Sequence, residues 1–377
     1  MSKGSMPIGK IFGISLRLHY SWFFIFPLIT WTLATSYFPA TYPDWTMSMK
    51  IAAGLLTSFL FFSSILIHEL CHSLVAIREG IQIPSITLFF LGGVSQMTSE
   101  PKSAGDEFRM AVAGPLSSLV LGGIFLGLFF ALRGLAAVPA QFVAAVAFYI
   151  GYINVFLGVF NLMPGFPLDG GRVFRSIIWW RSKDFLKATR IASYIGRAFG
   201  YLFIAGGLFL VFRGDFLNGV WLALIGWFLE SSAISSYSQL LVQDMLKGHT
   251  AGEIMTQDCT AVSPQTPLES FVNEILLSSG RRCYPVVANG HMEGLITLSD
   301  VKAIPRDDWS TTPVRQAMTP FDKVISVSPK EELSKVLQIM AEKDINQVPV
   351  VEDQNIIGMI ARDSIINFIQ VRTQLTK

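Results

Sequence analysis

The chain has 377 residues, of which 51% are hydrophobic and only 15% are charged, and its formal net charge is +2. Because soluble domains carry nearer to 25% charged residues, this composition predicts a membrane protein joined to a smaller soluble part. A charge so close to neutral, with no basic run, argues against nucleic acid as a partner.

Apolar runs that could cross a membrane follow one another through the first 230 residues. We expect six spans, at residues 20–38, 51–77, 111–132, 142–162, 191–212 and 216–229. The last run has only 14 uncharged residues, fewer than the roughly 20 that a spanning helix needs, so we expect it to end within the serine-rich segment 231–238. Twelve basic residues lie beside the spans on the side of the N-terminus and three on the other side, which predicts cytosolic N- and C-termini in a multi-pass cell-membrane protein.

The second span runs directly into the pentad His68-Glu69-Leu70-Cys71-His72. On a helix the two histidines share one face, so their imidazoles could hold one Zn²⁺ while Glu69 reaches a water bound to it. Ionisable groups at membrane depth cost about 3 kcal/mol or more each, which favours a metal site over a buried polar cluster whose imidazoles bind carbonyl groups. Cys71 is expected to pack as a small residue, since Cys71, Cys259 and Cys283 form no CxxC pair and suggest no disulfide.

Between the second and third spans, residues 83–97 are too short and too glycine-rich to cross the membrane. Two β-prone arms around Gly92 and Gly93 predict a hairpin that dips into the membrane. Its free edge could bind an unwound substrate helix as an added strand, which would make Gly92 and Gly93 substrate-binding residues. The alternative is a plug that covers the metal site, and the two roles are compatible.

The fourth span is followed by a second signature, Asn161-Leu162-Met163-Pro164-Gly165-Phe166-Pro167-Leu168-Asp169-Gly170-Gly171-Arg172. Its prolines and glycines end the helix and allow a close backbone approach, while Asp169 offers an oxygen ligand. Two histidines and one carboxylate leave the fourth position of a tetrahedral zinc open, as catalytic sites do. Because the second and fourth spans run in the same direction, His68, His72 and Asp169 should meet at one depth near the cytosolic side. Taken alone, an aspartate in such a loop would be a turn residue.

With both signatures present, the chain from about residue 8 to 230 resembles the site-2 protease family of intramembrane zinc metalloproteases, whose members carry a membrane HExxH and a downstream NxxPxxPLDGGR-type segment. Ala113-Gly114-Pro115, Leu91-Gly92-Gly93-Val94 and, more loosely, residues 17–22 also match. The resemblance implies one Zn²⁺ per chain, a transmembrane protein as substrate, and a substrate-binding role for Asn161. Asn154, earlier on the same span, is a weaker candidate and is expected to hydrogen-bond between helices.

The expected chemistry is peptide hydrolysis within the membrane. Zinc would lower the pKa of a bound water toward about 7, and Glu69 would accept the proton as general base and pass it to the leaving amine. Asn161 could hydrogen-bond the substrate backbone or the developing oxyanion.

From about residue 251 the chain is a tandem repeat with a period of roughly 64 residues, in which Met255-Thr256 recurs as Met318-Thr319 and Pro285-Val286-Val287 as Pro349-Val350-Val351. These landmarks resemble cystathionine-β-synthase (CBS) repeats, which pair into one α/β module, can dimerise and often bind adenine nucleotides. In the first repeat Gly294, Thr297 and Asp300 match the family's ribose- and phosphate-binding stretch, whereas the second has Ala361 and Ser364 at the matching positions. The resemblance therefore implies at most one nucleotide site, and a purely dimerising or scaffolding role stays open.

The sequence thus predicts an α-helical polytopic membrane domain with about six transmembrane helices and a membrane-dipping β-hairpin at residues 1–230, a linker at 231–250, and a soluble α/β tandem CBS module with repeats at 251–309 and 310–377. The leading function is an intramembrane zinc endopeptidase that lies in membrane lipid and cuts transmembrane segments of membrane-tethered regulatory proteins. Its CBS pair is expected to be a regulatory module through which two chains can form a homodimer. The second is a CBS-regulated transporter or channel that binds a metal ion with the same side chains, although a transporter has no need of Glu69 beside the first histidine. A proteolytically inactive scaffold is disfavoured because the three ligands and the base are intact.

Overall fold

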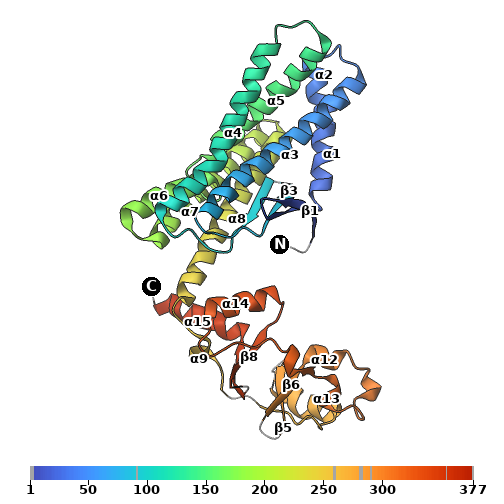
Figure 1. Cartoon of the computed structure of the whole chain (residues 1–377), viewed down its shortest axis with the longest axis vertical. Coiled ribbons are helices and arrows are strands. Elements are labelled where there is room, and N and C mark those ends of the chain that lie inside the picture. Colours follow the sequence, from blue (N-terminus) through green and yellow to red (C-terminus); the bar gives the residue numbers. More distant parts are fainter. Residues whose placement is uncertain are drawn as a thin grey trace. The chain divides into compact units, whose positions relative to one another are not determined.

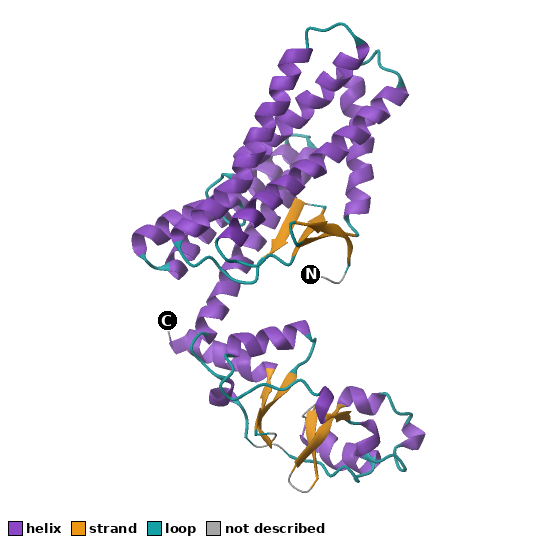
Figure 2. Ribbon diagram, viewed as in Figure 1, coloured by secondary structure: helices purple, strands orange, loops and turns teal. Residues whose placement is uncertain are grey.

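The computed structural model describes residues 4–90, 92–257, 260–279, 283–288, 291–353 and 355–375. The chain divides into two compact units between Ser238 and Gln239, which Figure 1 follows by colour along the sequence. The first unit is mostly helical and carries one small sheet, and the second contains both helices and strands (Figure 2). This confirms the predicted fold class. Leu91 of the predicted hairpin and Cys259 lie outside the described residues.

Six helices of the described chain are long and apolar enough to cross a membrane, as predicted. The first is a composite of α1 (Trp22–Thr32), a π-helical turn at Leu33–Tyr37 and α2 (Phe38–Thr41). The others are α3 (Met47–Arg78), α4 (Ala104–Leu132), α5 (Val138–Asn161), α7 (Phe185–Phe212) and α8 (Phe216–Leu246). A shorter helix, α6 (Asp169–Ser182), begins at the aspartate of the second signature.

The last helix is longer than we predicted. It does not end in segment 231–238 but continues to Leu246, through most of the expected linker at 231–250. Serine is tolerated in a helix when its hydroxyl returns a hydrogen bond to the preceding turn, as Ser236 Oγ does to the carbonyl oxygen of Ser232 at 2.9 Å. Leu246 is buried in a core of the second unit, so an apolar contact beyond the serines stabilises the end of α8.

Helix α4 lies among α3, α5 and α6 and packs against all three (Figure 1). Glycine brings the α4 and α5 backbones close together: a Cβ on Gly151 would lie 2.9 Å from the backbone nitrogen of Leu126. Close backbone approach of this kind is the usual basis of helix packing in membranes, where helices gain no hydrophobic stabilisation from each other. Helices α3 and α5 contact each other and start at the same end of the bundle. The two signatures, which lie toward the C-terminal ends of these helices, are therefore at the opposite end of the bundle, together.

A four-stranded sheet lies beside the C-terminal half of α3 (Figure 1). Its order is β1 (Ser5–Ile11), β2 (Ile14–His19), β3 (Ser85–Phe89) and β4 (Gly92–Gln96). Strands β3 and β4 are antiparallel and form the predicted hairpin. Strand β2 pairs with β3 in parallel. The sheet packs on α3 through buried side chains that include Ile14, Leu16 and Ile86, and β1 and β4 are its outer strands.

The second unit consists of two similar halves, as the tandem repeat predicted. Its elements are α9 (Ala251–Ile254), α10 (Leu268–Ser270), a π-helical turn at Phe271–Leu276, α11 (Leu277–Ser279), β5 (Cys283–Ala288), β6 (His291–Thr297), α12 (Leu298–Lys302), α13 (Val314–Ala317), β7 (Thr319–Pro320), α14 (Leu333–Glu342), β8 (Gln347–Glu352), β9 (Asn355–Ala361) and α15 (Arg362–Leu375), with short 3₁₀ turns at Arg306–Asp308 and Phe321–Lys323. Val262 bridges to Val286 in the first half and Val327 to Val350 in the second, both in parallel. Each half has its own hydrophobic core.

Candidate metal centre

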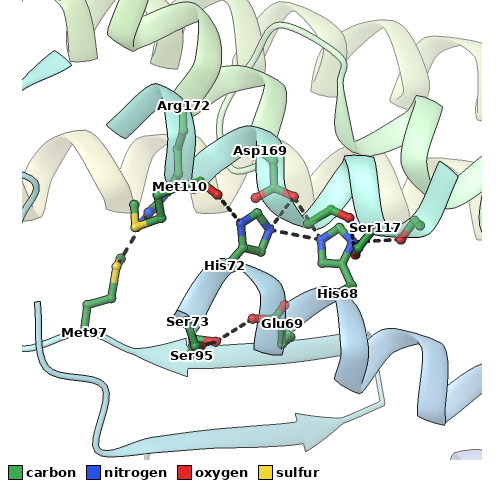
Figure 3. Close-up of polar contacts among 12 residues, drawn as sticks. His68, Glu69, His72, Ser73, Ser95, Met97, Met110, Ser117, Asp169 and Arg172 are labelled. Carbon is green, nitrogen blue, oxygen red and sulfur yellow. Dashed lines mark hydrogen bonds and ion pairs between the residues drawn. The ribbon is translucent and has the colours of Figure 1, made fainter. Parts of the chain in front are cut away.

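Three ligand-type side chains converge where α3 passes the start of α6 (Figure 3). His68 and His72 lie one turn apart on α3, as their spacing predicted. The Oδ2 atom of Asp169 lies 3.1 Å from Nε2 of each histidine, and the two Nε2 atoms are 3.2 Å apart. Within the part of the chain that the structure describes, no other set of His, Cys, Asp or Glu side chains forms such a group.

The second nitrogen of each imidazole is already engaged. Nδ1 of His72 lies 2.7 Å from the carbonyl oxygen of Met110. Because a carbonyl can only accept, Nδ1 carries a proton, and Nε2 faces Asp169, where its lone pair would be available to a metal ion in place of a proton. Nδ1 of His68 lies 2.9 Å from Oγ of Ser118. Two ring nitrogens and a carboxylate oxygen that face one another suit a cation such as Zn²⁺, with partners behind them that fix the ring orientations.

Glycine brings Asp169 to this position. A Cβ on Gly170 would lie 2.2 Å from the carbonyl carbon of Leu162, so the chain can turn back between α5 and α6 only without a side chain there.

Burial raises the pKa of Asp169, but the charge of His72 and hydrogen bonds from both imidazoles lower it more, and the pKa lies below its usual range. The carboxylate is therefore charged at neutral pH, as a metal ligand must be.

A buried ion pair holds α6 against α4. Arg175 is 2% exposed and Glu107 is 0% exposed. Nε of Arg175 donates to Glu107 Oε1 at 2.7 Å, and a terminal nitrogen contacts the same oxygen. The rings of Phe166 and Phe185 lie 4.9 and 4.5 Å from the guanidinium carbon. The pair thus fixes the helix that begins with Asp169.

Gly114 on α4 lies against the ring of His72. A Cβ at this position would be 2.1 Å from Nε2 and 2.6 Å from Cδ2 and Cε1 of that ring. No side chain larger than hydrogen fits there while His72 keeps its place. The glycine of the Ala113-Gly114-Pro115 match is therefore explained by the space that the imidazole occupies.

Glu69 points toward β4 (Figure 3). Its Oε2 atom accepts a hydrogen bond from Oγ of Ser95 at 2.7 Å. Gly93, on the same strand, is so close that a Cβ there would lie 2.5 Å from Cγ of Glu69. Strand β4 thus holds Glu69, the predicted base, while the neighbouring His68 faces His72 and Asp169.

The remaining predicted residues of the membrane unit have varied surroundings. Asn161 is the last residue of α5 and is partly buried, and its side chain has no hydrogen-bond partner among the described residues. Gly92 begins β4 with φ of 139°, a value that favours glycine. Asn154 Nδ2 donates to Oγ of Ser64 on α3 at 3.2 Å, which is the interhelical hydrogen bond that we expected.

Thr297 and Asp300 bind each other at the start of α12. The carboxylate of Asp300 accepts from the backbone nitrogen of Thr297 at 2.8 Å and from its Oγ1 at 2.7 Å, while Asp300 N donates to Oγ1 at 3.3 Å. This is a capping box, which stabilises a helix start. The two residues lie together as the CBS resemblance implies, and they have a structural role of their own.

Several contacts at the centre were not predicted from the sequence: those of Ser95, Ser118, the Met110 carbonyl group, and the pair Glu107 and Arg175. Each joins segments far apart in the chain, and a lone serine or a charge near a helix end carries no local pattern. Gly114 alone had a signal, in the three-residue match at the start of the third span.

Comparisons with known proteins find relatives for both the membrane unit and the tandem repeat. The model of peptidase family M50 matches residues 56–145 and 135–203, and that of the CBS domain matches residues 251–306 and 314–371. The protein sll0528 of Synechocystis sp., which is named as a zinc metalloprotease, is 32% identical over 367 residues, covering 96% of this chain and 95% of that protein. Zinc metalloprotease MJ0392 of Methanocaldococcus jannaschii is 30% identical over 369 residues, covering 97% and 96%. A solved site-2 protease from Methanocaldococcus jannaschii aligns with a TM-score of 0.42 and 28% identity, covering 61% of this chain and 94% of that one.

Proposed function

The chain belongs to peptidase family M50, the site-2 protease family of membrane zinc metalloproteases, and from this premise we propose that it cuts transmembrane segments of membrane-tethered regulatory proteins. The observation that carries the proposal is the convergence of His68, His72 and Asp169 beside helices long enough to span a membrane, with Glu69 next to the first histidine. The transporter alternative has lost its support, because relatives that match over the whole length are named as zinc metalloproteases.

We assign one Zn²⁺ per chain to His68, His72 and Asp169. When bound there, the ion supplies a Lewis acid that activates water and polarises a peptide carbonyl group. The chain's own part begins with orientation: the Met110 carbonyl oxygen and the Ser118 hydroxyl hold the two imidazoles from behind. Partners of this kind typically raise metal affinity by 10- to 100-fold.

Glu69 acts as the general base. One of its carboxylate oxygens accepts the proton of the attacking water and later delivers it to the nitrogen of the leaving amine. Because Oε2 already accepts from Ser95, Oε1 is the oxygen left for this transfer. Partial burial of the side chain limits access of bulk water, which favours proton transfer within the site.

Strand β4 offers a place for the substrate. It pairs with β3 on one side and forms an outer strand of the sheet, and it contacts α3, which carries the histidines. An unwound transmembrane segment could add to β4 as a further strand beside Glu69, with Gly92 and Gly93 allowing its close approach. The free amide of Asn161 could hydrogen-bond the substrate backbone or the developing oxyanion.

The CBS pair is proposed as a regulatory module on the cytosolic side, on which both termini lie. A ligand can regulate only if it binds two arrangements of the protein with different affinity. An adenine nucleotide bound through Thr297 and Asp300 is one candidate, and pairing of two chains through their CBS repeats is another.

The test is cleavage of candidate single-span regulatory proteins, reconstituted with the full chain in lipid vesicles. The native chain should release fragments cut within the transmembrane segment, whereas Glu69→Gln should keep its zinc and fold but cut at least roughly 100-fold more slowly, because the amide cannot accept a proton. Substantial activity of Glu69→Gln would rule out Glu69 as the base. Absence of cleavage by the zinc-loaded native chain would count against the proposed substrate class.

A further inference from the structure

A chain of hydrogen bonds links the sheet to Glu69. Ser95 Oγ donates to Glu69 Oε2 at 2.7 Å, and Ser73 Oγ donates to Ser95 Oγ at 3.2 Å. Since a carboxylate can only accept, the single proton of Ser95 is directed at Glu69, and its lone pair is available to Ser73. Ser73 is 1% exposed, so water does not compete for its hydroxyl. The directions of both hydrogen bonds are therefore fixed.

The register of β4 is what brings Ser95 to Glu69. Gly93 pairs with Leu88 and Ser95 with Ile86 in the β3–β4 ladder. Residues two apart in a strand point to the same face, which is why both Gly93 and Ser95 touch the Glu69 side chain. A slip of one residue would turn Ser95 to the opposite face and place the side chain of a neighbour against Glu69.

Gly93 restricts Glu69 from a second side. The Cγ and Cδ atoms of Glu69 lie 2.5 and 3.1 Å from the place where a Gly93 Cβ would be. The Glu69 side chain therefore lies directly over the backbone of β4, with its Oε2 atom bound by Ser95 two residues further along. One packing contact and one charge-assisted hydrogen bond define its orientation.

We propose that Ser95 is a positioning residue for the general base and that Ser73 fixes the hydroxyl of Ser95. The inference rests on the proposed function, because it takes Glu69 to be the base. It adds that the strand expected to receive the substrate is also the strand that orients Glu69. Substrate pairing and orientation of the base would then depend on the same five residues, Gly92–Gln96.

The first test compares kcat and KM of Ser95→Ala and Ser95→Thr with those of the native full chain in vesicles. Ser95→Ala should lower kcat roughly tenfold, equivalent to about 1.4 kcal/mol, with KM changed less than about twofold and zinc content unchanged, because substrate and metal contacts remain. Ser95→Thr keeps the hydroxyl and suits a strand, so it should recover most of the rate. If Ser95→Thr is as slow as Ser95→Ala, or if the loss appears only in KM, the positioning role is wrong.

A double-mutant cycle tests the part of Ser73. Ser73→Ala should lower kcat roughly two- to threefold in the native chain and have no effect in Ser95→Ala, since it acts through Ser95. The matched control is Ser85→Ala on the neighbouring strand, whose exposed hydroxyl donates to Gln96 Oε1 at 3.3 Å and does not contact Glu69. Ser85→Ala should cut at the native rate. Equal effects of Ser73→Ala in both backgrounds would overturn the proposed relay.

The outcomes for the two proposals are distinguishable. A native chain that does not cleave, with Glu69→Gln the same, would count against the proposed substrate class. A native chain that cleaves while Ser95→Ala retains full kcat would overturn only the inference about Ser95. Loss of zinc from Ser95→Ala would also overturn it, because a residue that acts through Glu69 should leave the metal ligands undisturbed.

Discussion

The contact between Gly114 and His72 leads to a quantitative prediction for Gly114→Ala. The new Cβ would begin 2.1 Å from His72 Nε2. A van der Waals contact needs about 3.5 Å, so the His72 ring or helix α4 would have to move by roughly 1.4 Å. Metal–ligand distances tolerate only about 0.2 Å, and the other side of the ring is held by the Met110 carbonyl oxygen at 2.7 Å. His72 should therefore cease to be an effective ligand.

We expect Gly114→Ala to lower zinc affinity by more than about 100-fold, the upper end of the effect of removing a partner behind a ligand, and to lower cleavage in proportion. The assay is competition of the purified full chain with a chelator, followed by metal analysis. The matched control is Gly123→Ala, on the same helix, since a Cβ there would meet no neighbouring segment within 4 Å. Native zinc affinity in Gly114→Ala would refute the steric reasoning.

Two further predictions concern buried charge and the CBS repeats. Arg175→Met and Glu107→Leu should each destabilise the chain by about 3–5 kcal/mol, because each leaves a buried charge without its partner. The double variant should lose less free energy of unfolding than the two single variants added together. Additive losses in thermal unfolding would argue against a coupled pair. Asp300→Ala should weaken any binding of AMP, ADP or ATP and also lower stability by about 0.5–2 kcal/mol through loss of the capping box. If calorimetry on the native chain detects no heat with any of the three nucleotides, the CBS pair acts as a scaffold or binds a different partner.

The sequence predicted the parts of the site whose chemistry follows from local spacing. His68 and His72 lie on one face because they are four residues apart on a helix, and Asp169 meets them because α3 and α5 run in the same direction. These inferences need only helix periodicity and the order of the spans. The same reasoning predicted the β3–β4 hairpin, since β-prone arms flank two glycines.

Other features depend on long-range packing and could not be predicted in this way. Strands β1 and β2 were not predicted, because β3, the partner of β2, lies far along the sequence. The extension of α8 depends on Leu246, which is buried by residues of the second unit. Glu107 carries no local signal, because the buried arginine that pairs with it comes from α6, 68 residues further along the chain.

The parallel pairing of β2 with β3 sets an order for assembly of the protein. Ser15 pairs with Ser85, so 70 residues (85 minus 15) separate the partners, and α1 and α3 lie between them. The β1–β2 hairpin leaves the ribosome first, but it must wait until two membrane helices have been synthesised before β3 can join it. Pairing of β2 with β3 is therefore a later event than formation of the β1–β2 hairpin. The nascent chain therefore holds Glu69 before it has β4, the strand that contacts Glu69, and it receives Asp169 only after two further helices have been synthesised.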